Sequence, residues 1–150
     1  MPDRKTLERA TEDKREGKSP GTQAGEFVRE EMDHIREGKH GAANTKQAIA
    51  IGLSKARRAG VDLAQPKKGR VSEKVRKQAA RDTKAGHSRK KKAVSAKRSR
   101  SSEAALKREP RSAASHKALS RQAKSAARTR KQRGTVTAGS RRTQSRRKAA

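Results

Sequence analysis

The chain has 150 residues, with 43 Lys or Arg against 15 Asp or Glu and a formal net charge of +28. Only 28% of the residues are hydrophobic, with one Phe, no Trp or Tyr and no Cys. This composition excludes an ordinary globular domain over the whole length, and it excludes disulfides, thiol catalysis and cysteine–metal sites. No apolar run approaches the roughly 18–20 residues that span a bilayer, and the N-terminus lacks the apolar stretch of a secretory signal. We therefore expect a cytoplasmic protein.

The charge divides the chain into two parts. Residues 1–65 hold 13 Lys or Arg and 11 Asp or Glu, whereas residues 66–150 hold 30 and four. The first part is nearly neutral and the second is a polycation.

Residues 1–18 are predicted to form a solvated, frayed helix, because this segment is rich in charged and helix-forming residues but poor in apolar ones. Ser19 and Pro20 then supply an N-cap and a proline at the first helical position. From there to Glu37 the sequence predicts a helix that ends at Gly38. Its apolar stripe consists of Ala24, Phe27, Val28, Met32 and Ile35.

A second helix, beginning after Asn44, is the best specified element of the chain. Asn44 is a favourable N-cap, and Gln47 stands at the position of a capping box. Gly60 and Val61 fit a Schellman ending. One face of this helix carries Ile49, Leu53 and Ala56.

The two helices and the loop 38–43 predict a helical hairpin over residues 19–63. We expect the first helix to be acidic on its outer side and the second to be basic, which favours the antiparallel pair. Because apolar side chains are few, the hairpin is expected to be marginal, and a homodimer through it stays open. The predicted core consists of Phe27, Val28, Met32, Ile35, Ile49 and Leu53.

Residues 64–150 are predicted to form a basic low-complexity tail, kept largely disordered by the repulsion between its cations. Transient helices are expected at about residues 72–85, 102–109 and 112–133, and the last should become continuous when phosphates neutralise it. The predicted fold class is mainly α, a small helical hairpin with a long, largely disordered basic C-terminal tail.

The excess of cations in the tail predicts a polyanionic partner, because each contact of Lys or Arg with a phosphate releases a condensed counterion. Nucleic acid is expected, with DNA favoured over RNA, and an anionic membrane surface or an acidic protein is the alternative. The tail has no aromatic residue to stack on bases, so the binding should be non-specific. The predicted binding residues are Lys67, Lys68, Arg70, Arg89, Lys90, Lys91, Lys92, Lys97, Arg98, Arg100, Lys107, Arg108, Arg121, Lys124, Arg128, Arg130, Lys131, Arg133, Arg141, Arg142, Arg146 and Arg147.

No constellation typical of catalysis is visible, so we expect neither an enzyme nor a small-molecule substrate or cofactor. Glu31 and His34 have the i,i+3 spacing of di-iron bundles, but such sites need a second copy of the motif. His34, Glu37 and His40 are a second combination of metal-ligand types. A solvated acidic face accounts for these residues, and no metal is predicted.

The string from Thr45 to Gly60, TKQAIAIGLSKARRAG, resembles a family of uncharacterised bacterial proteins whose hallmark reads approximately KQAIAIALSEARKAG. The segments 26–32 and 38–41 fit the same family's pattern of a helix and a Gly/Lys loop. The resemblance covers residues 24–63 and implies a bacterial source, but no activity. Gly52 and Lys55 stand where the family commonly has Ala and Glu. The tail resembles linker-histone-like ends in composition only.

These features predict non-specific nucleic-acid binding through the polycationic tail, in a nucleoid-associated accessory protein. Two alternatives stay open. One is a protein-interaction module whose tail only localises it, and the other is an RNA- or ribosome-associated factor.

Overall fold

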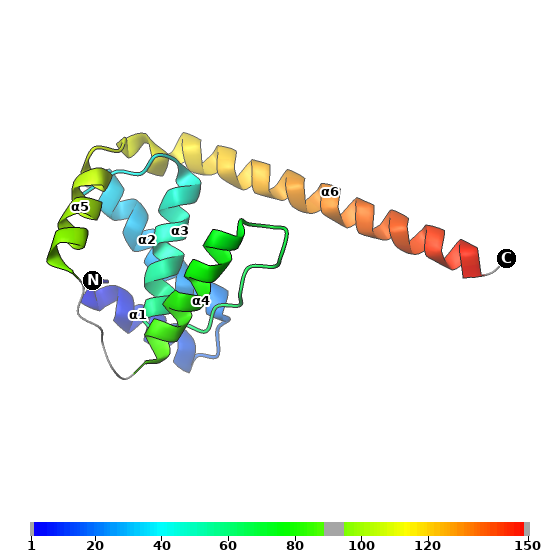
Figure 1. The fold of residues 1–150 in the computed structure, drawn as a ribbon, viewed down its shortest axis with the longest axis horizontal. Helices are drawn as coiled ribbons and strands as arrows, with labels where there is room; N and C mark the ends of the chain where they lie inside the picture. Colours follow the sequence, from blue (N-terminus) through cyan, green and yellow to red (C-terminus); the bar gives the residue numbers. More distant parts are fainter. Residues whose placement is uncertain (1, 89–94, 149–150) are drawn as a thin grey trace. The chain divides into compact units, whose positions relative to one another are not determined.

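The computed structural model describes residues 2–88 and 95–148, with side chains as far as Gln132 (Figure 1). The described residues form helices and no named strand, which confirms the prediction of a mainly α-helical chain. The chain divides into two units, Met1–Ser115 and His116–Ala150. The first unit contains α1 (Arg4–Arg15), α2 (Pro20–Arg36), α3 (Thr45–Arg58), α4 (Glu73–His87), α5 (Ala96–Lys107) and the 3₁₀ helix η1 (Arg111–Ala114), and the second contains α6 (His116–Lys148).

The ends of α3 are fixed by local hydrogen bonds. The side chain of Asn44 accepts from the amide of Gln47 at 2.9 Å, and the Gln47 side chain reaches back to the amide of Ala43 at 3.0 Å. At the other end Gly60 takes a φ of 93°, and the amide of Val61 donates to Ala56 at 3.1 Å. This is the Schellman ending, and Val61 is buried beside Ala56.

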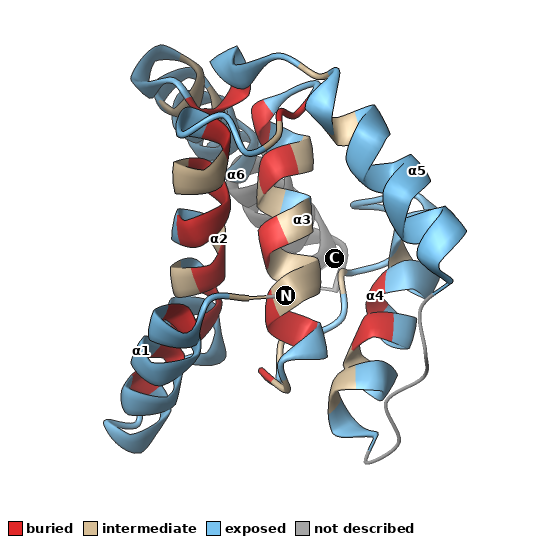
Figure 2. Ribbon diagram, turned by 90° about the vertical axis from the view of Figure 1, so that its left-hand side faces the viewer, coloured by how far each residue is buried: buried red, intermediate tan, exposed pale blue. Residues whose placement is uncertain are grey.

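Helices α2 and α3 pair, and the buried positions of both follow the sides that face each other (Figure 2). Of the predicted core, Phe27, Met32 and Ile35 are buried. Val28, Ile49 and Leu53 are only half-buried. The side of α3 that is buried instead carries small residues, namely Thr45, Ala48, Gly52 and Ala56.

Gly52 explains why this face is rotated from the predicted one. A Cβ atom built on Gly52 would lie 2.7 Å from the Cα atom of Val28 and 3.0 Å from its nitrogen. The two backbones therefore approach so closely that no side chain fits at this position. The larger Ile49 and Leu53 lie beside the crossing point and stay partly exposed.

Replacing Gly52 by Leu is expected to destabilise the first unit by about 3 kcal/mol, the upper end for overpacking, because the clashing atoms belong to the backbone. Urea unfolding followed by circular dichroism measures the effect. Ala50→Leu, at an exposed position of the same helix, is the matched control and should be close to neutral. A Gly52→Leu chain as stable as the control would show that the helices do not cross at Gly52.

Helix α1 packs on α2 instead of forming the solvated, frayed helix predicted from the sequence. Its buried residues are small or polar: Thr6, Ala10 and Asp13. Arg9 forms an ion pair of 2.8 Å with Glu26 of α2. A face built from such residues gives no apolar stripe, which is why the sequence pattern did not indicate the contact.

Helix α4 packs on α3 and extends the first unit beyond the predicted hairpin. Its anchor is Asp82, which is 3% exposed and therefore buried. One carboxylate oxygen accepts from Ser54 at 2.7 Å, and the other accepts from Arg58 at 2.8 Å. Val75, the largest apolar residue of this helix, is 47% exposed.

The segment around η1 closes the end of the hairpin. The side chain of Thr45 donates to the carbonyl of Ala113 at 2.7 Å, and Arg36 donates to the carbonyl of Ala114 at 3.1 Å. Gly41 donates to the carbonyl of Leu106 at 2.8 Å. Hydrogen bonds thus hold both ends of the hairpin loop against residues that lie about 70 positions further along the chain.

Candidate nucleic-acid interface and buried charge cluster

Helix α6 carries a straight row of cations on one face. The row consists of residues spaced four, three, four and three apart, and this spacing keeps them on the same side of a helix. All are exposed, and the helix contains no Asp or Glu that could neutralise them. At 1.5 Å per residue the row is about 21 Å long. We call it the basic row, and its members are Lys117, Arg121, Lys124, Arg128 and Lys131.

The predicted binding residues fall into three groups. Those of the first unit lie in the connection between α3 and α4, on α5 or directly after it. All are exposed: Lys67, Lys68, Arg70, Lys97, Arg98, Arg100, Lys107 and Arg108. Those of α6 with described side chains are also exposed: Arg121, Lys124, Arg128, Arg130 and Lys131. The others lie outside the described residues or side chains: Arg89, Lys90, Lys91, Lys92, Arg133, Arg141, Arg142, Arg146 and Arg147.

Two positions, one inside the predicted set and one outside it, modify the prediction. Lys107 forms an ion pair of 2.9 Å with Glu103, so part of its charge is already compensated. Lys117 was not among the predicted residues, although it begins the basic row. Counting the four-three spacing backwards from Arg121 would have found it.

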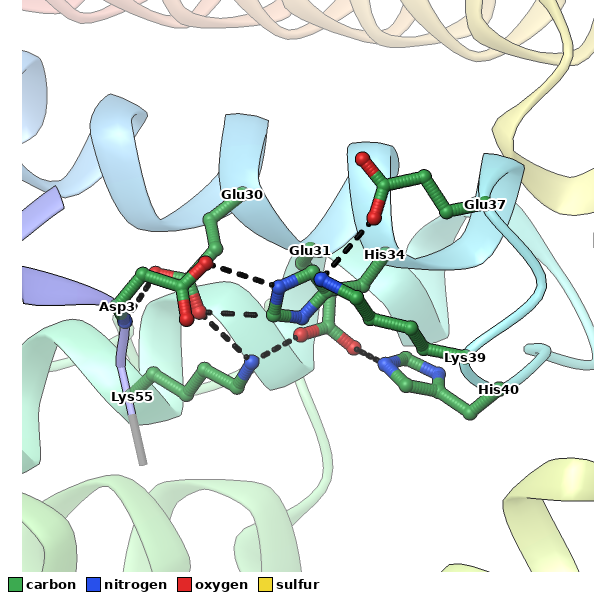
Figure 3. Close-up of polar contacts among 8 residues, drawn as sticks. All are labelled: Asp3, Glu30, Glu31, His34, Glu37, Lys39, His40 and Lys55. Carbon is green, nitrogen blue, oxygen red and sulfur yellow. Dashed lines mark hydrogen bonds and ion pairs between the residues drawn. The ribbon is translucent and has the colours of Figure 1, made fainter. Parts of the chain in front are cut away.

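A second set of charged residues lies inside the first unit, between α2 and α3 (Figure 3). Glu31 is fully buried and Glu30 is 4% exposed, which contradicts the predicted solvated acidic face. The Lys55 ammonium lies between the two carboxylates, 2.7 Å from Glu31 Oε2 and 3.3 Å from Glu30 Oε1. Neither oxygen of Glu31 accepts a hydrogen bond of ordinary geometry, so the pairing of Glu31 rests on charge.

His34 lies at the side of this cluster that faces the N-terminus. Its Nε2 is 3.2 Å from Asp3 Oδ2, and its Nδ1 is 3.9 Å from Glu30 Oε1. The hydrogen bond from His34 lowers the pKa of the Asp3 carboxyl below its usual range. Asp3 is held from a second direction, because its amide donates to Glu30 at 3.1 Å.

His40 comes from the loop that follows α2. Its Nε2 is 3.2 Å from Glu31 Oε1, and its Nδ1 is 3.1 Å from the carbonyl oxygen of Gly41. The rings of His34 and His40 stand nearly perpendicular, with centroids 6.2 Å apart. The hairpin fold therefore brings Glu31, His34 and His40 together, whereas Glu37 instead pairs with Lys39 at 3.0 Å.

Among the described residues, two groups place metal-ligating atoms within 4.8 Å of one another: Glu31, His34 and His40, and Asp3, Glu30 and His34. The described residues contain no helix that is long and apolar enough to cross a membrane. No family model, curated protein or solved structure matches this chain. The resemblance of residues 24–63 to the uncharacterised bacterial family stays a prediction.

Proposed function

We propose that this chain is a non-specific nucleic-acid-binding protein that attaches to duplex DNA through its C-terminal cations, as a nucleoid-associated accessory protein. The observation that carries the proposal is the basic row on α6. Its five exposed cations share one face of a helix that contains no acidic residue.

The dimensions of the basic row suit a nucleic-acid backbone. Duplex DNA carries one negative charge per about 1.7 Å of its axis, so a row about 21 Å long lies opposite roughly 12 phosphates of the two strands. Single Lys and Arg side chains then have several phosphates within reach. Binding through phosphates uses cations that reach the backbone and needs no side chain that reads the edges of the bases. A regular row of exposed Lys and Arg fits this mode of binding.

The chemistry of the remaining surface favours the phosphates over the bases. The only aromatic ring of the Phe, Tyr and Trp type in the chain belongs to Phe27, which is 1% exposed. No such ring is therefore available to stack on an unpaired base, and stacking is the usual basis of single-strand binding. This supports a duplex partner bound by charge.

The charge of the second unit supports the same partner. Residues 116–150 contain 12 Lys or Arg and no Asp or Glu, whereas residues 1–115 contain 31 and 15. Many cations of the first unit lie in ion pairs, as Arg9 does with Glu26 and Arg58 with Asp82. The second unit is thus the part of the chain with the most uncompensated charge per residue.

Neutralising the basic row tests the proposal. In the variant Arg121→Gln, Lys124→Gln, Arg128→Gln and Lys131→Gln, the slope of log affinity against log salt is expected to become shallower by up to about 3.6, because each lost phosphate contact removes about 0.9. Fluorescence anisotropy with a labelled duplex measures the slope.

The matched control removes four cations that are already paired with acidic groups and were not predicted to bind, through Arg4→Gln, Lys18→Gln, Lys39→Gln and Arg76→Gln. The two variants have the same net charge. Equal slopes for both would mean that the net charge alone attracts the duplex, and that the basic row has no role. Competition with duplex RNA then separates DNA binding from the RNA-associated alternative.

A further inference from the structure

The buried cluster between α2 and α3 has more negative than positive groups. The carboxylates of Glu30 and Glu31 share a single ammonium, that of Lys55. Asp3 adds a third carboxylate at the exposed edge of the cluster, where it pairs with His34. With both imidazoles neutral, the formal charge of the cluster is therefore −2. Glu31 is fully buried and Glu30 nearly so, and a buried charge without a partner is costly. Lys55 compensates only one of the two buried carboxylates, so at least one further positive charge is needed at this place.

The two imidazoles are already oriented by groups outside the centre of the cluster. Nδ1 of His40 faces the carbonyl oxygen of Gly41, an acceptor, and must carry a proton there. Nε2 of His34 faces the carboxylate of Asp3, which is also an acceptor. Metal-binding histidines show this arrangement, in which the second ring nitrogen donates to a carboxylate or a backbone carbonyl.

These hydrogen bonds decide which nitrogen of each neutral ring has a free lone pair. In His40 it is Nε2, which points at Glu31 Oε1 from 3.2 Å. In His34 it is Nδ1, which lies 3.9 Å from Glu30 Oε1. A lone pair directed at a carboxylate oxygen repels it unless a cation or a proton lies between them. The close approach of His40 Nε2 to Glu31 Oε1 thus calls for a positive species beside these two atoms.

We propose that Glu31, His34 and His40 bind a divalent transition-metal ion, Zn²⁺ by its ligand chemistry, inside the hairpin. Two imidazoles and one carboxylate are a set of three protein ligands that zinc uses elsewhere. Zinc bonds of about 2.0–2.2 Å in a tetrahedron place ligand atoms roughly 3.3–3.6 Å apart, and the 3.2 Å between His40 Nε2 and Glu31 Oε1 lies close to the lower limit. The ligand atom of His34 lies within 4.8 Å of those of Glu31 and His40, so a shift of its side chain on binding would complete the set.

The ion also balances the cluster. The +2 charge of the ion and the +1 charge of Lys55 together balance the −3 charge of the carboxylates of Asp3, Glu30 and Glu31. Lys55 keeps its contact with Oε2 of Glu31. Mg²⁺ and Ca²⁺ fit less well, because they require about six or more oxygen ligands. The bound ion joins α2 to the loop before α3, so it fixes the hairpin. This role is independent of the proposed nucleic-acid binding.

The test uses the full chain, stripped with a chelator and titrated with Zn²⁺ in a calorimeter, with thermal unfolding followed in parallel. The expected result is one ion per chain, a higher unfolding temperature with Zn²⁺, and the visible absorption of tetrahedral Co²⁺ when Co²⁺ replaces it. In His40→Gln the affinity should fall by at least about 100-fold, because loss of a ligand exceeds the 10–100-fold effect of an outer partner.

The other two histidines supply the matched control. His87 pairs with Asp62 at 2.7 Å on the surface and His116 begins α6, so His87→Gln and His116→Gln should bind Zn²⁺ as the unchanged chain does. Zinc binding that survives in the double variant His34→Gln and His40→Gln would overturn the proposal. An unchanged unfolding temperature in Zn²⁺, with stability that instead rises on acidification, would also overturn it, because protons on the two imidazoles would then supply the charge.

Discussion

Raising the salt concentration from 50 to 200 mM is expected to weaken the binding of this chain to a DNA duplex by roughly ten-thousand-fold. If about 8 phosphates are neutralised, log affinity should fall against log salt with a slope near −7, since each contact releases a condensed counterion. In the proposed binding mode the basic row would supply five of these contacts, and exposed cations such as Lys67, Lys68 and Arg70 would supply the others.

The same salt series should give nearly equal affinities for unrelated duplexes, because phosphates carry no direct sequence information. Two scrambled duplexes and one single strand, compared by fluorescence anisotropy, measure this. A shallow slope, or a thousand-fold preference for one duplex, would mean that a surface other than the polycation recognises the partner. Lys46, an exposed cation of α3, would then be the first to replace.

Replacing Lys55 by Met is expected to destabilise the chain by about 3–5 kcal/mol in the presence of a chelator. Removing one member of a buried ion pair leaves the other charge without compensation, and here two carboxylates, those of Glu30 and Glu31, would both lose their shared cation. A loss of this size is a large part of the stability of an ordinary domain. Urea unfolding followed by circular dichroism measures it.

Two further variants separate the charge effect from packing. Lys46→Met removes an exposed cation of the same helix and should change stability by less than about 0.5 kcal/mol. Combining Glu31→Gln with Lys55→Met should recover part of the loss, because one of the uncompensated charges is gone. If Lys55→Met is no more harmful than Lys46→Met, water or mobile ions solvate the cluster and the two glutamates are not buried as described.

The sequence alone was sufficient for the local features of the hairpin. Asn44 and Gly60 mark the ends of α3 through hydrogen bonds that span only a few residues, and Ser19 caps α2 in the same way. Such bonds depend on residue type and spacing, so the pattern predicts them. The excess of Lys and Arg over Asp and Glu in residues 66–150 likewise follows directly from the amino-acid sequence.

What only the tertiary structure decided is which polar residues are buried. Glu31 and Asp82 have the spacing and residue type of solvent-exposed positions, yet Glu31 is fully buried against Lys55 and Asp82 is 3% exposed against Ser54 and Arg58. Their partners lie 24 to 28 positions along the chain, so no local period relates them. Glu31 is buried where α2 and α3 cross closely at Gly52, and Asp82 is buried where α4 packs on α3. Both interfaces form between helices that are distant in the sequence, so only the tertiary structure reveals them.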